Sequence, residues 1–280
     1  MPIYNEFAYV YHQGPYTAYS FRMTGLLPGV LDRFGCHPQV LLDLACGEGS
    51  FAITLAKQGM QVTGVDASTR MLQIARMKAA EGGAKVQFIE MDMRNLDFAN
   101  SFDLATCWFD SLNYLLELED LEKTFLGVLH ALKPGGLFIF DMNTLYGLAV
   151  LWQQSAESIQ QDTPEIVEIH RTSFDFDSAT ATVMITAFLK EDQAWRRIDE
   201  IHQERGYPIA QIHELLTTCG FVVLACYGNL SDMSEPDSES GRVWFVARKS
   251  GLQVEARSKE ITPPHPRRLI KGNKLHKARP

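Results

Sequence analysis

Two glycines and two acidic residues lie close together in the stretch Leu-Leu-Asp-Leu-Ala-Cys-Gly-Glu-Gly-Ser, residues 41–50. Gly47 and Gly49 have no side chains, so the polar atoms of a ligand can approach bare backbone there. Asp43 and Glu48 indicate which kind of ligand this is. A loop that holds a pyrophosphate should offer amides and the positive end of a helix, not two negative side chains. The stretch therefore favours a ligand that carries positive charge.

The same stretch also fits the dinucleotide-binding pattern G-x-G-x-x-G/A, so an NAD-binding loop is one alternative. Gly47, Gly49 and Ala52 supply the pattern, and Asp66 ends the strand expected next along the chain. A second alternative is an ordinary Rossmann-type turn with two accidental acids. Residues further along the chain have to distinguish these interpretations.

More acidic residues follow the strands that the sequence predicts. Asp66, Asp92, Asp110 and Asp141 lie at or just past the ends of apolar runs, and open α/β sheets bind ligands outside the carboxyl ends of their strands. Asp66 is placed to accept hydrogen bonds from both hydroxyls of a ribose, and Asp92 from an adenine amino group. The alternatives are a helix cap for Asp66 and a turn residue for Asp92.

Strands and helices alternate through residue 142, which is typical of right-handed βαβ crossovers and a parallel sheet. Apolar runs predict strands at residues 40–44, 61–66, 86–90, 102–107 and 137–142, with helices at about 50–57, 69–81 and 119–132. After residue 150 the pattern changes to polar–apolar alternation, which predicts an antiparallel meander. Its strands, and the helix and strand pair that follow, are expected at residues 165–174, 180–189, 195–204, 208–220, 221–227 and 243–247.

These elements predict an α/β fold: a doubly wound, seven-stranded, mostly parallel sheet with an antiparallel lid inserted after the fifth strand. Four regions are expected along the chain. They are an N-terminal helical and aromatic segment (1–37), the α/β domain (38–150 and 206–250), the lid (151–205) and a flexible basic tail (251–280).

Charge is unevenly distributed along the 280 residues. The net charge is −8, and the tail from Gly251 onward, with eight basic and two acidic residues, contributes +6, which leaves −14 on residues 1–250. Nucleic-acid binding depends on neutralising phosphates, so we expect no nucleic-acid partner for this acidic body. The tail has the charge to contact RNA, membrane or acidic partners, but a solvated terminus is the favoured interpretation.

Cysteines and apolar runs bear on location. The five cysteines are scattered, with no C-x-x-C pair, which favours reduced thiols in a cytoplasmic protein. No apolar run approaches the roughly 20 residues that span a bilayer, and the first residues do not resemble a signal peptide. We therefore expect no membrane partner, and the sequence leaves a homodimer open.

Five motifs in residues 38–145 resemble, in order, those of the class I methyltransferases that use S-adenosylmethionine (SAM). They are Asp43-x-Ala45-x-Gly47-x-Gly49, Gly64-Val-Asp66-Ala-Ser, Glu90-Met-Asp92-Met, Phe102-Asp-Leu-Ala-Thr and Leu132-Lys-Pro-Gly-Gly. SAM has no phosphate, and its sulfonium and ammonium groups suit an acidic loop better than NAD does. The resemblance implies that Asp66 binds the ribose, that Asp92 and Met93 bind the adenine, and that the glycine loop faces the methionine part. The other cofactor positions expected are Asp43, Ala45, Ala67 and Met71.

Further segments look like a bacterial group of small SAM methyltransferases with an antiparallel lid, similar to the sugar N-methyltransferases and glycine N-methyltransferase. They are Tyr11, Cys107-Trp-Phe-Asp-Ser-Leu-Asn-Tyr114, Phe140-Asp-Met-Asn143 and Ile198-Asp-Glu-Ile-His-Gln-Glu-Arg-Gly-Tyr207. Methyltransferases acting on nucleic-acid amines usually carry [Asp/Asn]-Pro-Pro-[Tyr/Phe] after the fourth strand. The Phe-Asp-Ser-Leu found there instead argues for a small-molecule acceptor.

Methyl transfer from a sulfonium is an in-line displacement, so alignment in a dry pocket can supply most of the acceleration. A base is needed only to deprotonate the acceptor. The candidates are His202, Glu204 and Asp110, with Tyr11 or Asn113 as orienting groups. One face of a predicted strand carries Glu200, His202 and Glu204, and this face is either solvated or the wall of a site. The histidines lack the spacing of a metal-ligand set, so no metal is expected.

The sequence as a whole predicts a SAM-dependent methyltransferase acting on a small molecule. Transfer to nitrogen is preferred to oxygen on the family resemblance alone. Two other functions stay open: a catalytically inactive SAM-binding module that acts through partners, and an NAD-dependent oxidoreductase.

Overall fold

The computed structural model describes residues 3–251 of the chain. The predicted basic tail lies outside the described residues except for Gly251. Within residues 3–251, no helix is both long and apolar enough to cross a membrane.

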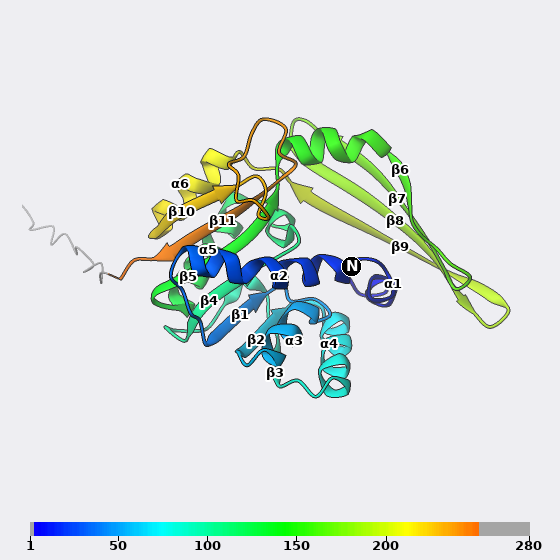
Figure 1. Cartoon of the computed structure of the whole chain (residues 1–280). Helices are drawn as coiled ribbons and strands as arrows, with labels where there is room; N and C mark the ends of the chain where they lie inside the picture. The colour runs from blue at the N-terminus through cyan, green and yellow to red at the C-terminus, as the bar shows by residue number, and fades with distance from the viewer. Residues whose placement is uncertain (1–2, 252–280) are drawn as a thin grey trace, which may run out of the picture.

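A seven-stranded sheet forms the centre of the molecule, with strand order β10-β11-β5-β4-β1-β2-β3 (Figure 1). Five strands run parallel, and the last two pair antiparallel at the β5 edge. Their bounds are β1 (Val40–Leu44), β2 (Gln61–Asp66), β3 (Val86–Glu90), β4 (Phe102–Cys107), β5 (Leu132–Asn143), β10 (Phe221–Tyr227) and β11 (Arg242–Lys249). The predicted doubly wound sheet is confirmed.

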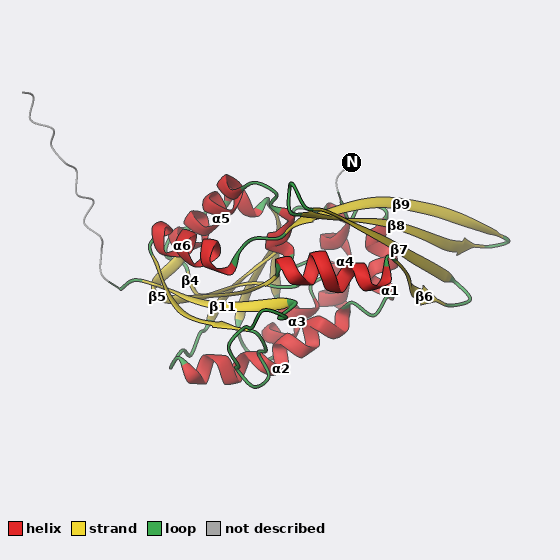
Figure 2. Cartoon of the chain, turned by 90° about the horizontal axis from the view of Figure 1, so that it is seen from above, coloured by secondary structure: helices red, strands yellow, loops and turns green. Residues whose placement is uncertain are grey.

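Helices cover both faces of this sheet (Figure 2). They are α2 (Thr17–Arg33), α3 (Ser50–Lys57), α4 (Thr69–Glu81), α5 (Leu118–Ala131) and α6 (Ile209–Cys219), while α1 (Phe7–Gln13) packs against the lid. Leu41 of β1 belongs to the core beneath α2 and α3, whereas Leu42 and Leu44 belong to the core beneath α5 and α6. Both faces of β1 are therefore buried, which is why its sequence is an apolar run rather than an alternation.

The fifth strand is longer than the sequence predicted. The Lys-Pro-Gly-Gly run was expected to precede a strand at residue 137, but β5 begins at Leu132. An irregularity in the register absorbs these residues, because Phe102 pairs with Leu132 and Leu104 already pairs with Leu137. Gly135, with φ +82°, makes this possible because it has no Cβ.

The lid is a separate four-stranded antiparallel sheet, inserted between β5 and α6. Its strands are β6 (Glu157–Asp162), β7 (Ile166–Asp175), β8 (Thr180–Glu191) and β9 (Ala194–Arg205). The sequence predicted the last three and missed β6. That strand reads Glu-Ser-Ile-Gln-Gln-Asp, and it is an edge strand with one neighbour. Its side chains need little apolar character, so no alternation reveals it.

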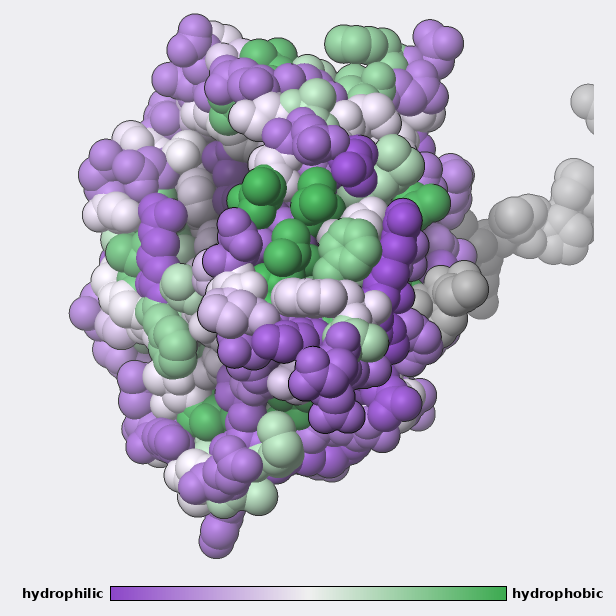
Figure 3. Space-filling view, turned by 90° about the vertical axis from the view of Figure 1, so that its right-hand side faces the viewer, coloured by the Kyte–Doolittle hydropathy of each residue, from purple (hydrophilic) through white to green (hydrophobic). Residues whose placement is uncertain are grey.

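The lid strands extend away from the main sheet, and α1 lies under them (Figure 1). Phe7 and Val10 of α1 pack against Val183, Ile185 and Ile198 on the inner face of the lid. Apolar side chains also gather on the side of the molecule from which the lid projects (Figure 3). The N-terminal segment is thus clamped between the lid and the edge of the sheet where the strands end.

Candidate active site

The loop between β1 and α3 presents backbone to a cavity at one glycine and packs tightly at the other. Ala45, Gly47 and Gly49 have φ angles of +48°, +54° and +82°, a region that favours glycine. A Cβ at Gly47 would meet nothing within 4 Å, whereas one at Gly49 would lie 2.9 Å from atoms of both Ala75 and Phe88. Gly47 therefore faces open space, and Gly49 allows the close packing of the loop on α4 and β3.

Asp66, at the end of β2, holds the neighbouring loops and also faces the cavity. Its Oδ2 accepts a hydrogen bond from the Gly47 amide at 2.8 Å, and its Oδ1 accepts one from the Ser68 amide at 2.8 Å. Each carboxylate oxygen keeps a further lone pair, and Asp66 lines the cavity. Burial raises the pKa of Asp66. Capping α4 was the alternative role for Asp66. The residue that caps this helix is Ser68, whose side chain accepts a hydrogen bond from the Met71 amide.

The cavity lies outside the carboxyl ends of β1, β2 and β3 and has a volume of about 340 Å³. This is within the range of small-molecule sites. The predicted cofactor positions in its wall are Ala45, Gly47, Asp66, Ala67, Met71, Asp92 and Met93. Asp43 and Gly49 are not among its lining residues. A second part of the lining, called the aromatic wall below, contains Tyr4, Tyr11, Phe109 and Tyr114. Of these, the sequence had singled out only Tyr11 as a site residue.

Asp92 serves as a turn residue and also lines the cavity. Its Oδ1 accepts from the backbone amide of Arg94 at 2.9 Å, and both carboxylate oxygens accept from the Arg94 guanidinium. These hydrogen bonds from Arg94 hold the pKa of Asp92 below its ordinary value. Arg94 also bonds Asp120 at 2.9 Å. Asp92 is therefore a fixed, ionised acceptor at the cavity rim.

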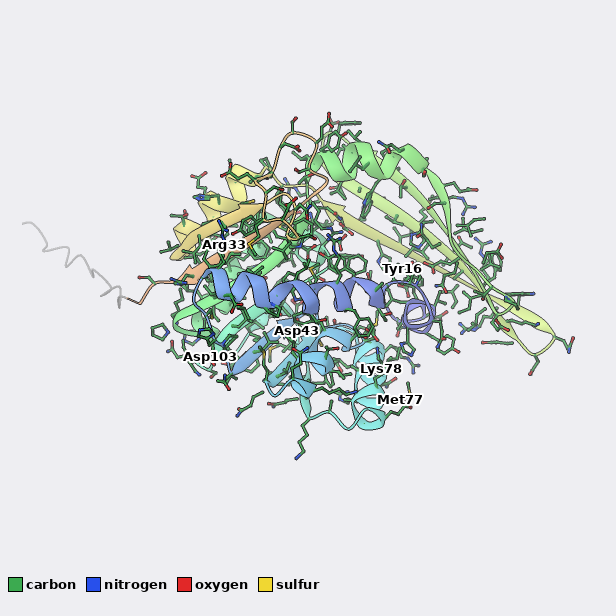
Figure 4. All side chains as sticks on the ribbon, in the orientation of Figure 1. Tyr16, Arg33, Asp43, Met77, Lys78 and Asp103 are labelled. Atoms are coloured by element: carbon green, nitrogen blue, oxygen red, sulfur yellow. The ribbon has the colours of Figure 1, made fainter. Side chains whose placement is uncertain are left out.

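Glu48 does not line the cavity. The sequence argument that Asp43 and Glu48 together attract a cationic ligand is therefore wrong for Glu48. Its buried carboxylate forms an ion pair with Lys78 of α4, so its charge is neutralised within the protein. Asp43 is also buried, accepts from the Thr106 hydroxyl at 2.8 Å, and burial raises its pKa to about 7. Figure 4 labels Asp43 at the end of β1 and Lys78 on α4.

The carboxylates in the cavity wall are Asp66, Asp92 and Asp120. Arg94, which also lines the cavity, pairs with Asp92 and Asp120, so Asp66 is the one of the three with no cationic partner among the described residues, and Asp43 lies behind it.

His202, one of the predicted bases, lies behind the aromatic wall. Its side chain is buried, with Nδ1 at 2.9 Å from the Tyr114 hydroxyl and Nε2 at 3.1 Å from Glu200 Oε2. His202 is not among the residues that line the cavity, whereas Tyr114 is. The hydrogen bond of the histidine toward the cavity is therefore the one to Tyr114.

Glu204 and Asp110, the two other predicted bases, are held in a buried polar network. The Asn143 side-chain amide donates to Asp110 at 2.5 Å and to Glu204 at 2.8 Å, and Arg242 pairs with Asp110 and Asp141. Burial and the charge of Asp110 raise the pKa of Glu204 well above its ordinary value. Neither carboxyl lines the cavity.

Asn113, the predicted orienting group, also serves this interior. Its side-chain amide donates to the backbone oxygens of Asn143 and Arg205, and its Oδ1 accepts from the Asn143 amide. These bonds use the side-chain hydrogen-bonding groups that would otherwise reach an acceptor. Asn113 therefore joins β5 to the end of β9 rather than pointing at the cavity.

The N-terminal segment closes over the cavity because Glu200 of the lid holds it there. Glu200 accepts from the backbone amides of Tyr4 at 2.8 Å and of Glu6 and Phe7 at 3.0 Å each. On the other side, the Ser68 hydroxyl donates to the Tyr4 carbonyl at 2.8 Å. These contacts join positions separated by 196 and 64 residues, and no local sequence signal could have revealed them.

Tyr11 stacks on Tyr16, with ring centroids 4.5 Å apart. The Tyr16 hydroxyl donates to Glu168 on β7, and Glu168 also pairs with His170 at 2.6 Å (Figure 4 labels Tyr16). Tyr11 is thus the one predicted catalytic candidate that lines the cavity, and its ring is fixed by a second aromatic residue anchored to the lid.

The sequence matches a family model described as "Methyltransferase domain" over residues 41–136. YqeM of Bacillus subtilis, a protein named as a methyltransferase, is 32% identical over 253 residues, which cover 89% of this chain and 98% of the relative. These matches include the glycine loop, Asp66 and Asp92.

Solved structures are similar over nearly the whole chain. An S-adenosylmethionine-dependent methyltransferase from Clostridium acetobutylicum ATCC 824 is 28% identical, with a TM-score of 0.75 over 89% of this chain and 100% of the other. The sugar N-methyltransferase KedS8 from Streptoalloteichus sp ATCC 53650 is 17% identical, with a TM-score of 0.67 over 88% and 92% of the two chains. At 17% identity, the similarity to KedS8 is a similarity of fold. Because it covers 88% of this chain, it extends beyond the central sheet.

Proposed function

Because the chain belongs to the class I SAM-dependent methyltransferases, we propose that it transfers the methyl group of SAM to a small-molecule acceptor, and to nitrogen in preference to oxygen. The observation that carries the proposal is the cavity of about 340 Å³ with two unlike walls. One wall lies at the strand ends and carries the carboxylates of Asp66 and Asp92. The other is aromatic and is roofed by the N-terminal segment. A roofed cavity of this size suits a metabolite better than a polymer.

The residues of the polar wall fit SAM. We assign the ribose hydroxyls to Asp66, whose two oxygens are already oriented by backbone amides. We assign the adenine to Asp92 and Met93, with Ala67 and Met71 as apolar neighbours, and the methionine part to the loop at Ala45 and Gly47. When bound, SAM supplies a methyl carbon on a positively charged sulfur.

The aromatic wall explains how the chain would favour the reaction. Ring faces attract cations, so Tyr4, Tyr11, Phe109 and Tyr114 suit a sulfonium and a charged or partly charged acceptor. The same rings exclude water, and a dry cavity strengthens electrostatic interactions within it. We propose Tyr11 as a residue that orients the acceptor, since it lines the cavity and is stacked firmly on Tyr16.

The preference for nitrogen rests on the resemblance to the sugar N-methyltransferases, one of which shares the fold. An amine presents a lone pair to the methyl carbon once one proton has been lost, so a modest base is sufficient. We also propose the cytoplasm as the location, because all five cysteines are unpaired thiols. The NAD-dependent alternative is set aside, since the family uses SAM.

The test is transfer of an isotopically labelled methyl group from SAM to a panel of amino sugars and to a fractionated metabolite extract. We expect the label in a compound that passes an ultrafiltration membrane, and not in added tRNA or protein. SAM binding measured by calorimetry serves as the control for a correctly folded site. Binding of SAM without transfer to any acceptor would support the inactive-module alternative and contradict the proposal.

A further inference from the structure

Three side chains from distant segments form a hydrogen-bonded series that begins at the cavity and leads away from it. Tyr114, which ends the 3-10 turn η2 (Ser111–Tyr114), lines the cavity. Its hydroxyl lies 2.9 Å from His202 Nδ1 and 3.1 Å from the Tyr4 hydroxyl. Because the Tyr114 proton points to His202, the Tyr4 hydroxyl donates to Tyr114 and leaves it one lone pair for the cavity. His202 Nε2 lies 3.1 Å from Glu200 Oε2. A tyrosine at a cavity wall thus has a histidine directly behind it, and the histidine has a carboxylate behind it.

The charge of Glu200 determines the direction of these hydrogen bonds. Burial raises the pKa of Glu200, but hydrogen bonds from His202 and from the backbone amides of Phe7 and Tyr4 bring it below its ordinary value. An ionised carboxylate only accepts, so His202 Nε2 must carry a proton and donate it to Glu200. Nδ1 of the neutral ring is then bare and accepts the hydroxyl proton of Tyr114. A base held in one tautomer by a carboxylate is the arrangement found in catalytic triads.

The surroundings of His202 protect this arrangement. The Tyr4 and Phe7 rings of the N-terminal segment lie edge-on to the imidazole, with centroids at 4.8 and 6.0 Å. The titratable groups that face the ring are Tyr4 from that segment, Tyr114 from η2 and Glu200 from its own strand, while the cross-strand neighbour is Val183. With the histidine only 3% exposed, its proton exchange is directed through Tyr114 and Glu200.

We propose that Tyr114 is the catalytic residue that takes the acceptor's proton, and that His202, positioned by Glu200, draws the proton from Tyr114. This inference rests on the proposed function. As the acceptor's nitrogen or oxygen bonds to the methyl carbon, the electrons of the breaking carbon–sulfur bond stay on sulfur. The acceptor's N–H or O–H bond breaks, its proton joins Tyr114 Oη, and the former hydroxyl proton of Tyr114 moves to His202 Nδ1. The resulting imidazolium is paired with the Glu200 carboxylate.

This path gives separate roles to residues that the sequence presented as equal candidates. The Glu204 and Asp110 carboxyls are bound by Asn143 and Arg242, so they hold the interior together. Tyr114 keeps its hydroxyl because burial raises its pKa well above the ordinary value. It therefore acts as a relay that gives up one proton while it receives another, and not as a phenolate.

The first test measures the histidine itself and needs no acceptor. Nitrogen-15 NMR of the imidazole rings, with His202→Gln identifying the His202 signals, reports which ring nitrogen carries the proton. We expect the Nε2–H form at neutral pH in the full-length protein, and a shift of the Nδ1 signal in Tyr114→Phe. An Nδ1–H form, or no response to Tyr114→Phe, would overturn the proton path.

The second test is kinetic and uses the acceptor that the labelling panel identifies. We expect Tyr114→Phe and His202→Gln to lower kcat on the order of 100-fold or more, with SAM affinity by calorimetry within about twofold of wild type. The pH dependence of kcat should differ between wild type and His202→Gln, because this variant lacks the ring that receives the proton from Tyr114. Tyr9→Phe on the exposed side of α1 and His213→Gln on the surface of α6 are the matched controls, and both should leave kcat unchanged.

The two proposals fail in different ways. If no acceptor is methylated by the wild-type chain, the proposed function fails and the proton path fails with it. If an acceptor is methylated and Tyr114→Phe is as active as wild type, the proton path alone is overturned. Glu200 is left intact in these experiments because its substitution would also release the N-terminal segment.

Discussion

The two walls of the cavity are built in opposite ways. The wall at the strand ends is made mainly by residues 45–94. Its main contacts are between residues close in the sequence: Asp66 accepts hydrogen bonds from amides that are 19 and 2 residues away. The hydrogen bonds that fix this wall come mainly from backbone amides. The aromatic wall combines the N-terminal segment with Phe109 and η2, and the lid holds it from behind. Tyr4 bonds Glu200 across 196 residues, and Tyr114 bonds His202 across 88. Side chains carry that wall.

The difference teaches how each wall can fail. The wall at the strand ends, called the local wall below, depends on a few backbone conformations. A single change there should therefore weaken binding while the fold persists. A wall assembled from distant segments depends on the buried groups that hold them together, so a single change there should weaken the fold itself. The following predictions test this contrast.

Replacing Arg242 should have the largest effect, because it holds the interior behind the aromatic wall. Arg242 is paired with Asp110 and Asp141, and breaking a buried pair leaves uncompensated charge that costs about 3–5 kcal/mol. We expect Arg242→Met to lose that much free energy of unfolding in urea denaturation. Arg171→Met is the control, since its pair with Glu157 is exposed and is worth about 1 kcal/mol or less. Equal losses in the two variants would show that buried charge does not hold this wall.

Asp66→Ala should weaken SAM binding by about 1–3 kcal/mol, because it removes the acceptor for the ribose hydroxyls. The substitution also leaves the Gly47 and Ser68 amides without their partner, so the loop loses its fixed shape. Calorimetry with SAM measures the effect, and the exposed Asp97→Ala serves as the control. The thermal unfolding of Asp66→Ala should stay cooperative. An unchanged SAM affinity would remove the ribose assignment.

The sequence was sufficient to predict the local wall. Apolar runs ending in Asp43, Asp66 and Glu90 give the strands, and the glycines between them give the loop, because these conformations depend on neighbours in the chain. Glu48 is the exception. Its role depends on Lys78, which α4 brings alongside from 30 residues away, and nothing in the loop indicates that pairing.

The aromatic wall could be predicted only in part. The alternation of the lid strands placed His202 and Glu204 on one face correctly, since that depends on the two-residue period alone. Which of them reaches the cavity depends on how Tyr114 and the N-terminal segment fold against the lid. The edge strand β6 was missed because it depends on pairing with β7. Its own residues are mostly polar and show no polar–apolar alternation that would predict a strand.

A smaller effect is expected from pH, through Asp43. Burial raises its pKa from 3.8 to about 7, so the fold favours the neutral acid, and this stabilising contribution is lost as pH rises through about 7. A cationic ligand favours the ionised acid instead. SAM affinity should therefore rise roughly three- to tenfold between about pH 6 and 8. In Asp43→Asn this rise should disappear, and calorimetry at both pH values decides. A pH-dependent rise that persists in Asp43→Asn would assign it to another group.

The smallest effect on binding is expected from Glu48, although the loop sequence puts it next to the ligand. Its carboxylate is buried against Lys78, and burial lowers the pKa of Lys78 to about 8. The two charges therefore compensate each other inside the wall and present little net field to the cavity. We expect Glu48→Gln to change SAM affinity by less than about twofold, or about 0.4 kcal/mol. A loss as large as that of Asp66→Ala, with Lys78→Met leaving affinity unchanged, would mean that Glu48 faces the ligand after all. The local wall would then bind its cation through the loop itself, and Asp43 would need no part in the pH dependence.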